Sequence, residues 1–372
     1  MNKQAVKKPL WFLVFVAMSA CIERIDFNAP TAQFLTVVEG LISDSPGPYT
    51  IKVSKGLSLD AESLVGAPVR NMKVRLYDDL GNSEDFTEDS PGIYKTKGVI
   101  QGEIGHAYHV LLETPDGKIF ESEPDVINPS GELENIKFEF EARTKVEKFG
   151  ESKIDVFNIY VDGKSAGSNE NFVRWRFTGT YKIVNNPELN QTETPPYSPY
   201  ADPWPCSGYI VVPKPPDILE KIGDCTCCIC WINQFESIPQ ISDAQFVNEN
   251  QFRNVKVGEV PINNITFSEK YLVEVEQLSL SKKAFDFFKL VRSQKEGASN
   301  LFQPPSGEIK GNIKSVNPSE PVIGLFLATS IKKKSIFIYS SDVPYLIPKK
   351  NTDTRPCTSY TNSTTIKPEL WQ

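Results

Sequence analysis

The stretch "AYHVLLETPDGKIFESEP", residues 107–124, carries the pattern that decides the fold. Tyr108–Glu113 is rich in large apolar side chains and is expected to form an extended strand. Pro115–Gly117 is a Pro-Asp-Gly turn sequence, and Lys118–Ser122 is expected to be the returning strand. This combination is typical of a β-hairpin, so we predict two antiparallel strands here.

The preceding region shows the same pattern of strand, turn and strand. Residues 34–44, "FLTVVEGLISD", are rich in β-forming types, and Pro46–Pro48 supplies a turn. In "YTIKVSKG", residues 49–56, every second side chain is apolar, and a further strand is expected over Met72–Tyr77. Short strands separated by regular turn sequences favour an immunoglobulin-like β-sandwich, which we place at residues 34–128.

The rest of the chain, residues 129–372, predicts a second β-rich domain. Its clearest strand lies within "NFVRWRFTGTYKIV", where Arg174 and Arg176 face opposite to Trp175. An insertion at about 185–243 follows, rich in proline, asparagine and cysteine and without hydrophobic periodicity. Loops of this length are usually functional or disordered, and the cysteines favour an ordered one.

One amphipathic helix is expected at about 281–296. Ser281 is suited to cap its N-terminus, apolar residues such as Ala284 and Phe288 recur at helical spacing, and Gly297 is suited to end it. The predicted fold class is therefore mainly β. An N-terminal immunoglobulin-like β-sandwich is followed by a second β-rich domain that carries this helix and the long Cys/Pro-rich insertion.

The N-terminus, residues 1–20, has the layout of a signal peptide. Basic residues precede an uncharged apolar run, Leu10–Met18, and the small residues Ser19 and Ala20 come just before Cys21. The run is shorter than the roughly 20 residues that span a bilayer. The small-small-Cys ending predicts a bacterial lipobox, in which Cys21 becomes the acylated N-terminus of a lipoprotein. The alternative is an ordinary signal peptide, with Cys21 free or disulfide-bonded.

A lipobox determines where the protein resides. The sulfur of Cys21 would carry a diacylglycerol, and more than one fatty acyl chain, such as palmitate, makes a durable anchor. Residues 21–33 would then be a tether leaving the lipid. No later segment is long and apolar enough for a second membrane span. The net charge of −7 on 372 residues argues against nucleic acid as a partner, because nucleic-acid binding needs clustered cations.

Six further cysteines favour disulfide bonds, since their number is even and the chain is predicted to be exported. They are Cys206, Cys225, Cys227, Cys228, Cys230 and Cys357. The C-x-x-C spacings leave a zinc site or a redox pair as alternatives. Four cysteines within 225–230 cannot readily pair only with one another. We therefore expect some of them to bond to Cys206 and Cys357, joining the insertion to the C-terminal tail.

Aromatic side chains gather in and around the insertion, and they are candidates for binding a partner or ligand. Aromatic anchors on loops dominate many interfaces, although the same rings can instead cover the disulfides. The candidates are Tyr197, Tyr200, Trp204, Tyr209 and Trp231.

We predict no catalytic residues, no metal site and no cofactor. His106 and His109 are expected on one strand, where a spacing of three points them to opposite faces and prevents shared metal binding. The acidic run Asp78–Gly92 lacks the spacing of a calcium loop and fits a hairpin tip. Glu274 and Glu276 share a strand face, which fits a solvated surface better than a glycosidase pair.

Several segments resemble one bacterial family, and the resemblance runs from about Cys21 to Trp371. The segments are "VVEGLISDSPGPYTIKVSKG" (37–56), "VRWRF" (173–177), "VEVEQLSLSKKAFDFF" (273–288), "LFQPPSGEIKGNI" (301–313), "VIGLFLATS" (322–330) and "KPELW" (367–371). Together they resemble the Bacteroidota family catalogued as domain of unknown function 4249.

The resemblance implies an outer-membrane lipoprotein whose genes often lie beside those of TonB-dependent receptors. It therefore implies a non-catalytic accessory or binding subunit with an outer-membrane β-barrel partner, anchored by acylated Cys21 and exposed at the cell surface. The alternatives are the periplasmic face of that membrane, an accessory of an outer-membrane assembly or secretion machine, and a surface adhesin that binds glycans or proteins. The resemblance implies no catalytic residue.

Overall fold

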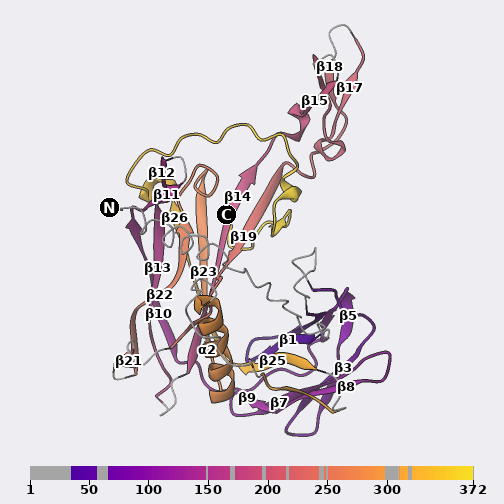
Figure 1. Ribbon diagram of the computed structural model, residues 1–372, viewed down its shortest axis with the longest axis vertical. Coiled ribbons are helices and arrows are strands. Elements are labelled where there is room, and N and C mark those ends of the chain that lie inside the picture. Colours follow the sequence, from indigo (N-terminus) through magenta and orange to yellow (C-terminus); the bar gives the residue numbers. More distant parts are fainter. Residues whose placement is uncertain are drawn as a thin grey trace, which may run out of the picture.

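A computed structural model describes most of the chain after the predicted tether. The described residues are 35–56, 66–147, 150–167, 172–194, 198–214, 218–242, 247–248, 250–297, 309, 311–316 and 321–371. Cys21 and the predicted signal peptide lie outside them. The described part is mainly β, as the sequence predicts, and it forms two β-sandwiches with an α-helix where they meet (Figure 1).

The first sandwich consists of two facing sheets. One has the order β25 (Val322–Thr329), β1 (Thr36–Ser43), β2 (Thr50–Lys55), β6 (Ile93–Lys95) and β5 (Thr87–Ser90). The other has the order β24 (Ile313–Ser315), β8 (Ile119–Ser122), β7 (Ala107–Glu113), β3 (Lys73–Asp78) and β4 (Ser83–Asp85), and β9 (Asp125–Val126) also pairs with β7.

Both predicted hairpins are confirmed. β7 and β8 pair with Leu112 opposite Phe120, and both of these side chains are buried. In β1 and β2 the alternation sends Ile51 and Val53 into the core between the sheets. The Tyr49 hydroxyl donates to the carbonyl of Ser43, which holds the connection between these two strands.

The first sandwich extends beyond the boundary that the sequence predicts at residue 128. β25 pairs in parallel with β1, and β24 pairs with β8, so these two strands return from late in the chain to complete both sheets. Gly324 permits this pairing, because its φ is +154° and a Cβ there would lie 1.9 Å from the Val38 carbonyl oxygen. Sequence reasoning assigned these strands to the second domain, since strand pairing between distant segments leaves no local pattern.

The second sandwich also has two sheets. One has the order β10 (Glu132–Glu141), β13 (Val156–Lys164), β22 (Gln251–Pro261) and β21 (Val247–Asn248). The other has the order β26 (Ile331–Tyr339), β23 (Lys270–Ser279), β14 (Val173–Val184), β19 (Ile229–Phe235) and β27 (Ser363–Thr364), with β20 (Gln240–Ile241) also on β14. A small hairpin, β11 (Thr144–Glu147) and β12 (Gly150–Lys153), adjoins it in sequence.

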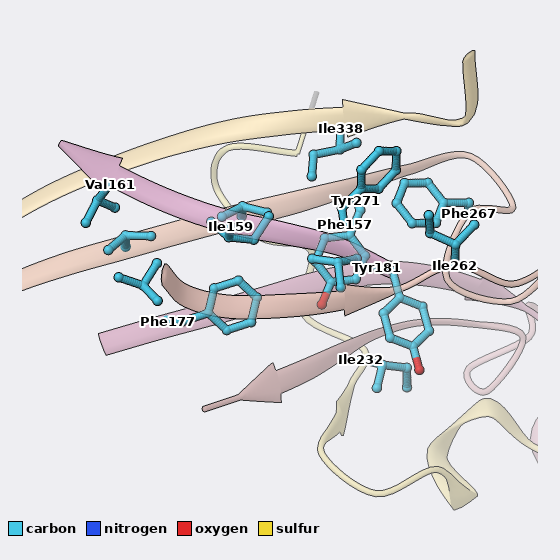
Figure 2. Packing of buried hydrophobic residues seen from close by; sticks show 14 of the residues in the cluster. Phe157, Ile159, Val161, Phe177, Tyr181, Ile232, Ile262, Phe267, Tyr271 and Ile338 are labelled. Atoms are coloured by element: carbon cyan, nitrogen blue, oxygen red, sulfur yellow. The ribbon is translucent and has the colours of Figure 1, made fainter. Parts of the chain in front are cut away.

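Figure 2 shows the core between these sheets, where Phe157 and Ile159 of β13 meet Phe177 of β14 and Tyr271 of β23. The predicted alternation of β14 is confirmed, with Trp175 fully buried. Burial of such side chains contributes about 1.5–3 kcal/mol each.

The predicted helix is also confirmed, as α2 (Lys282–Gly297). The backbone N–H of Ala284 donates to the Ser281 hydroxyl at 3.2 Å, so Ser281 caps the helix. Phe288 of α2 packs against Leu278 of the second sandwich and Leu327 of the first. α2 therefore packs at the junction between the two sandwiches (Figure 1).

Candidate functional site, a disulfide-bonded arm

An arm formed by residues 185–228 leaves the second sandwich between β14 and β19. It contains η1 (Pro187–Leu189), β15 (Gln191–Thr194), β16 (Ser198–Ala201), η2 (Pro205–Ser207), β17 (Tyr209–Val212) and β18 (Ile218–Lys221). Figure 1 shows this arm extending away from both sandwiches. The predicted insertion, 185–243, was too long, because β19 and β20 lie within it and belong to the second sandwich.

Three disulfides stabilise the arm and its base, which confirms the disulfide prediction. Cys206 bonds to Cys227, Cys225 to Cys228, and Cys230 to Cys357. The first links η2 to the end of the arm, and the last ties β19 to the C-terminal tail across 127 residues. As expected from the sequence, the insertion and the tail are thus joined at the same place.

Backbone hydrogen bonds reinforce the base of the arm. The N–H of Cys357 donates to the Cys227 carbonyl at 2.8 Å, and the N–H of Asn185 donates to the Cys228 carbonyl at 2.9 Å. The Asn185 side-chain amide donates to the Arg355 carbonyl at 2.8 Å. Hydrogen bonds therefore fix both ends of the arm to the tail, and the Cys230–Cys357 bond just beyond the arm adds a covalent link, which limits hinge motion at its root.

The carboxylate of Asp353 stabilises the same tail through hydrogen bonds. Asp353 accepts hydrogen bonds from the Arg355 guanidinium at 2.8 Å and from the Tyr360 hydroxyl at 2.6 Å. The bond from Arg355 is the main reason that the pKa of Asp353 lies far below its usual range, although partial burial opposes the shift. The same carboxylate raises the pKa of Tyr360, after burial as the larger cause.

The arm exposes apolar side chains that nothing in the described chain covers. Of the 22 large apolar or aromatic side chains that are exposed in the described residues, six lie in the arm, which is well above its share of the chain. They are Leu189, Tyr200, Trp204, Ile210, Ile218 and Ile222. These side chains are candidates for contact with a partner.

The aromatic candidates divide between surface and core. Tyr200 and Trp204 are exposed by 44% and 41%, and Tyr209 is half-buried on β17. Tyr197 lies outside the described residues. The prediction that Trp231 binds a partner is wrong. Trp231 is only 8% exposed and packs edge-on against Trp371, with ring centroids 6.5 Å apart. Its place on β19 directs it into a small core beside the tail, so it is not available to a partner.

The remaining candidate groups have partners within the fold. His106 precedes β7 and contacts Asp79 at 2.9 Å, whereas His109 lies on β7 and stacks on Tyr77. Both histidines were expected on the strand, but the strand begins one residue after His106. Within the acidic run, Asp78 accepts the backbone N–H of Asn82 at 2.7 Å and so stabilises the β3–β4 turn.

The paired carboxylates are also engaged. Glu274 contacts Lys333 at 2.7 Å, and Glu276 accepts from Arg176 at 2.7 Å. Among the described residues, no group of three or more His, Cys, Asp or Glu side chains is placed to hold a metal ion. The helix that the structure describes is neither long nor apolar enough to cross a membrane.

Two linked β-sandwiches, with a disulfide-bonded arm projecting from the second, define a mainly β protein. The chain matches the family described as "Domain of unknown function (DUF4249)" over residues 22–335, and it belongs to that family. No curated protein matches the chain.

Among solved structures, a DUF4785 family protein from Legionella pneumophila shows 10% identity and a TM-score of 0.16. That match covers 64% of this chain and 49% of the Legionella protein, so the chain spans about half the length of that relative.

Proposed function

We propose that this protein is a lipid-anchored, non-catalytic accessory subunit of a TonB-dependent outer-membrane receptor, and that its arm docks on the receptor. The observation that carries the proposal is the arm itself, which projects from the body (Figure 1). Several of its large apolar side chains are exposed. The lipobox predicted at Cys21 supports anchoring in a membrane. The family resemblance supports a TonB-dependent receptor as the class of partner.

The construction of the arm favours recognition of a protein partner. Binding requires that flexible groups be ordered, and elements that are already ordered lose less entropy. The Cys206–Cys227 and Cys225–Cys228 bonds order the arm in advance, and Trp204 and Ile222 stand exposed on it. Aromatic and large apolar anchors of this kind contribute most of the affinity at protein interfaces.

The test is affinity purification from detergent-solubilised outer membrane with a C-terminal tag. We expect one β-barrel receptor to co-purify with the wild-type protein. Ile222→Asp places a charge on the arm, where the side chain is 64% exposed, and it should abolish this co-purification. Val99→Asp is the matched control, because Val99 is 77% exposed on the first sandwich, and it should retain the receptor.

Other outcomes would redirect or refute the proposal. Co-purification that survives Ile222→Asp would show that the arm is not the docking element. Recovery of many assembly or secretion components, in place of one receptor, would show an accessory of that machinery instead. Absence of any membrane protein in the eluate would contradict the accessory role.

A further inference from the structure

A cleft of about 470 Å³ lies at the junction of the two sandwiches, away from the arm. One wall is the outer face of the first sandwich, where β1 and β25 run side by side. The opposite wall comes from β14 and β23 of the second sandwich, and α2 supplies the third side. Ligand sites are commonly found at such domain junctions and have volumes in this range.

Most of the cleft surface is apolar. Phe287, Phe288 and Val291 reach it from α2, and Leu41 and Leu325 reach it from the first sandwich. Phe288 is only 8% exposed, so the wall is part of a packed cluster and its shape is set by the fold. Such a surface favours a ligand with an apolar body.

The charged groups that line the cleft are predominantly cationic. They are Lys52, Arg174 and Arg176, against the single carboxylate of Glu39. The carboxylates that pair with the two arginines, Glu236 and Glu276, are not part of the lining. These carboxylates offset the charge of the two arginines, so the lining offers a ligand mainly guanidinium N–H donors and the ammonium group of Lys52. Such donors favour an anionic, hydrogen-bond-accepting end on the ligand.

Both arginines are held in position. Arg174 donates to Glu236 at 2.6 Å, and its guanidinium carbon lies 4.3 Å from the centre of the Phe288 ring. Its Nε–H is buried and meets no acceptor in the part of the chain that the structure describes. A buried donor without a partner is costly, which makes the environment of Arg174 receptive to an acceptor.

Arg176 is the more accessible of the two. Its Nε donates to Glu276 at 2.7 Å, its Nη2 contacts the same carboxylate, and its side chain is 35% exposed. A guanidinium carries five N–H donors in a planar fork, so Arg176 retains donors after pairing with one carboxylate. Planar forks of this kind match the two oxygens of a carboxylate.

We infer that this cleft binds a small carboxylate with an apolar body. The carboxylate lies against Arg176, beside Arg174 and Lys52, and the apolar part lies against Phe287, Val291 and Leu325. This binding is independent of the arm and of any receptor.

The test uses the full-length protein in phospholipid nanodiscs and isothermal titration calorimetry, with empty nanodiscs as the blank. The probes are naphthylacetate, naphthylacetamide and naphthylethylamine, which share an apolar ring system and differ in charge. We expect naphthylacetate to bind about tenfold more tightly than the amide. The amine should bind least, because the cleft is lined by cations.

Two substitutions separate the charged and apolar contributions. Arg176→Gln should bring the affinity for naphthylacetate down to that for the amide. Val291→Trp fills the cleft and should abolish binding of all three probes. Lys289→Trp is the matched control, because Lys289 is exposed on α2 and does not line the cleft, and it should bind like the wild type.

Circular dichroism establishes that each variant is folded, and the comparison of the three probes needs no variant at all. Equal affinity for the three probes would overturn the inference, as would wild-type affinity in Val291→Trp. Failure of naphthylacetate to bind the wild-type protein would overturn it as well.

Discussion

The indole N–H of Trp175 donates a hydrogen bond of 3.0 Å to the side-chain oxygen of Gln277, and both side chains are fully buried. The amide nitrogen of Gln277 donates in turn to the Ser130 carbonyl at 2.6 Å. Ser130 lies in the segment that connects the two sandwiches, between β9 and β10. Gln277 thus joins the core of the second sandwich to this connection.

Gln277→Leu should lower the free energy of unfolding by about 1–3 kcal/mol. Leucine cannot replace either hydrogen bond, so the Trp175 N–H and the Ser130 carbonyl remain buried without this partner. Urea denaturation followed by tryptophan fluorescence measures the change. Lys332→Ala is the control, because Lys332 pairs with Gln277 across the strands but is exposed, and it should change stability by less than about 0.5 kcal/mol. Equal stability of the two variants would contradict the role of Gln277.

Local sequence patterns predicted the local elements of this fold. The hairpins of the first sandwich, the alternation around Trp175 and the helix capped by Ser281 each follow from side-chain periodicity and from neighbouring turn or cap residues. The physical cause is short-range, since the period of an element and the geometry of its ends are set by adjacent residues.

Long-range pairing was not predictable in the same way. β25 was expected as a strand, but nothing near it indicates that it pairs with β1, almost 300 residues earlier in the chain. The arm was recognised only as an aperiodic insertion, because its strands are four residues long and its order comes from disulfides such as Cys206–Cys227. The cleft at the junction was not predicted, although the outward-facing Arg174 and Arg176 are visible in the sequence.

The Cys230–Cys357 disulfide should also contribute to the stability of the protein. Replacing Cys230 and Cys357 by serine should lower the free energy of unfolding by about 2–5 kcal/mol, because the bond closes a long loop. Urea denaturation of the oxidised protein measures it. Cys225→Ser with Cys228→Ser is the control, since that bond spans three residues and constrains the unfolded chain little. A larger loss in the control pair would show that the tail bond does not secure the body.

The depressed pKa of Asp353 predicts a pH dependence. Because the folded pKa lies below the ordinary value of about 3.9, the contribution of the ionised group is complete above that value and is lost as the pH falls below it. Asp353→Asn should therefore destabilise the protein at pH 7 and lessen the loss of stability on acidification. Thermal denaturation between pH 7 and pH 3 measures both effects. Glu369→Gln is the control, because Glu369 is exposed in the same tail, and it should show the wild-type dependence of stability on pH. If Asp353→Asn also showed the wild-type dependence, the prediction would be contradicted.

Cys21→Ala tests the membrane anchor on which the proposed receptor partnership depends. Thioether attachment of a diacylglycerol needs the cysteine sulfur, so the variant should incorporate no acyl label and should leave the membrane fraction. The wild-type protein should be labelled by radioactive palmitate and sediment with the outer membrane, because more than one buried acyl chain gives a durable anchor. The pair Cys225→Ser and Cys228→Ser serves as the control for loss of cysteine in general, and it should retain both label and membrane. Wild-type protein that stays membrane-bound without acyl label would show that an unmodified segment holds it there, and the lipobox interpretation would then be wrong.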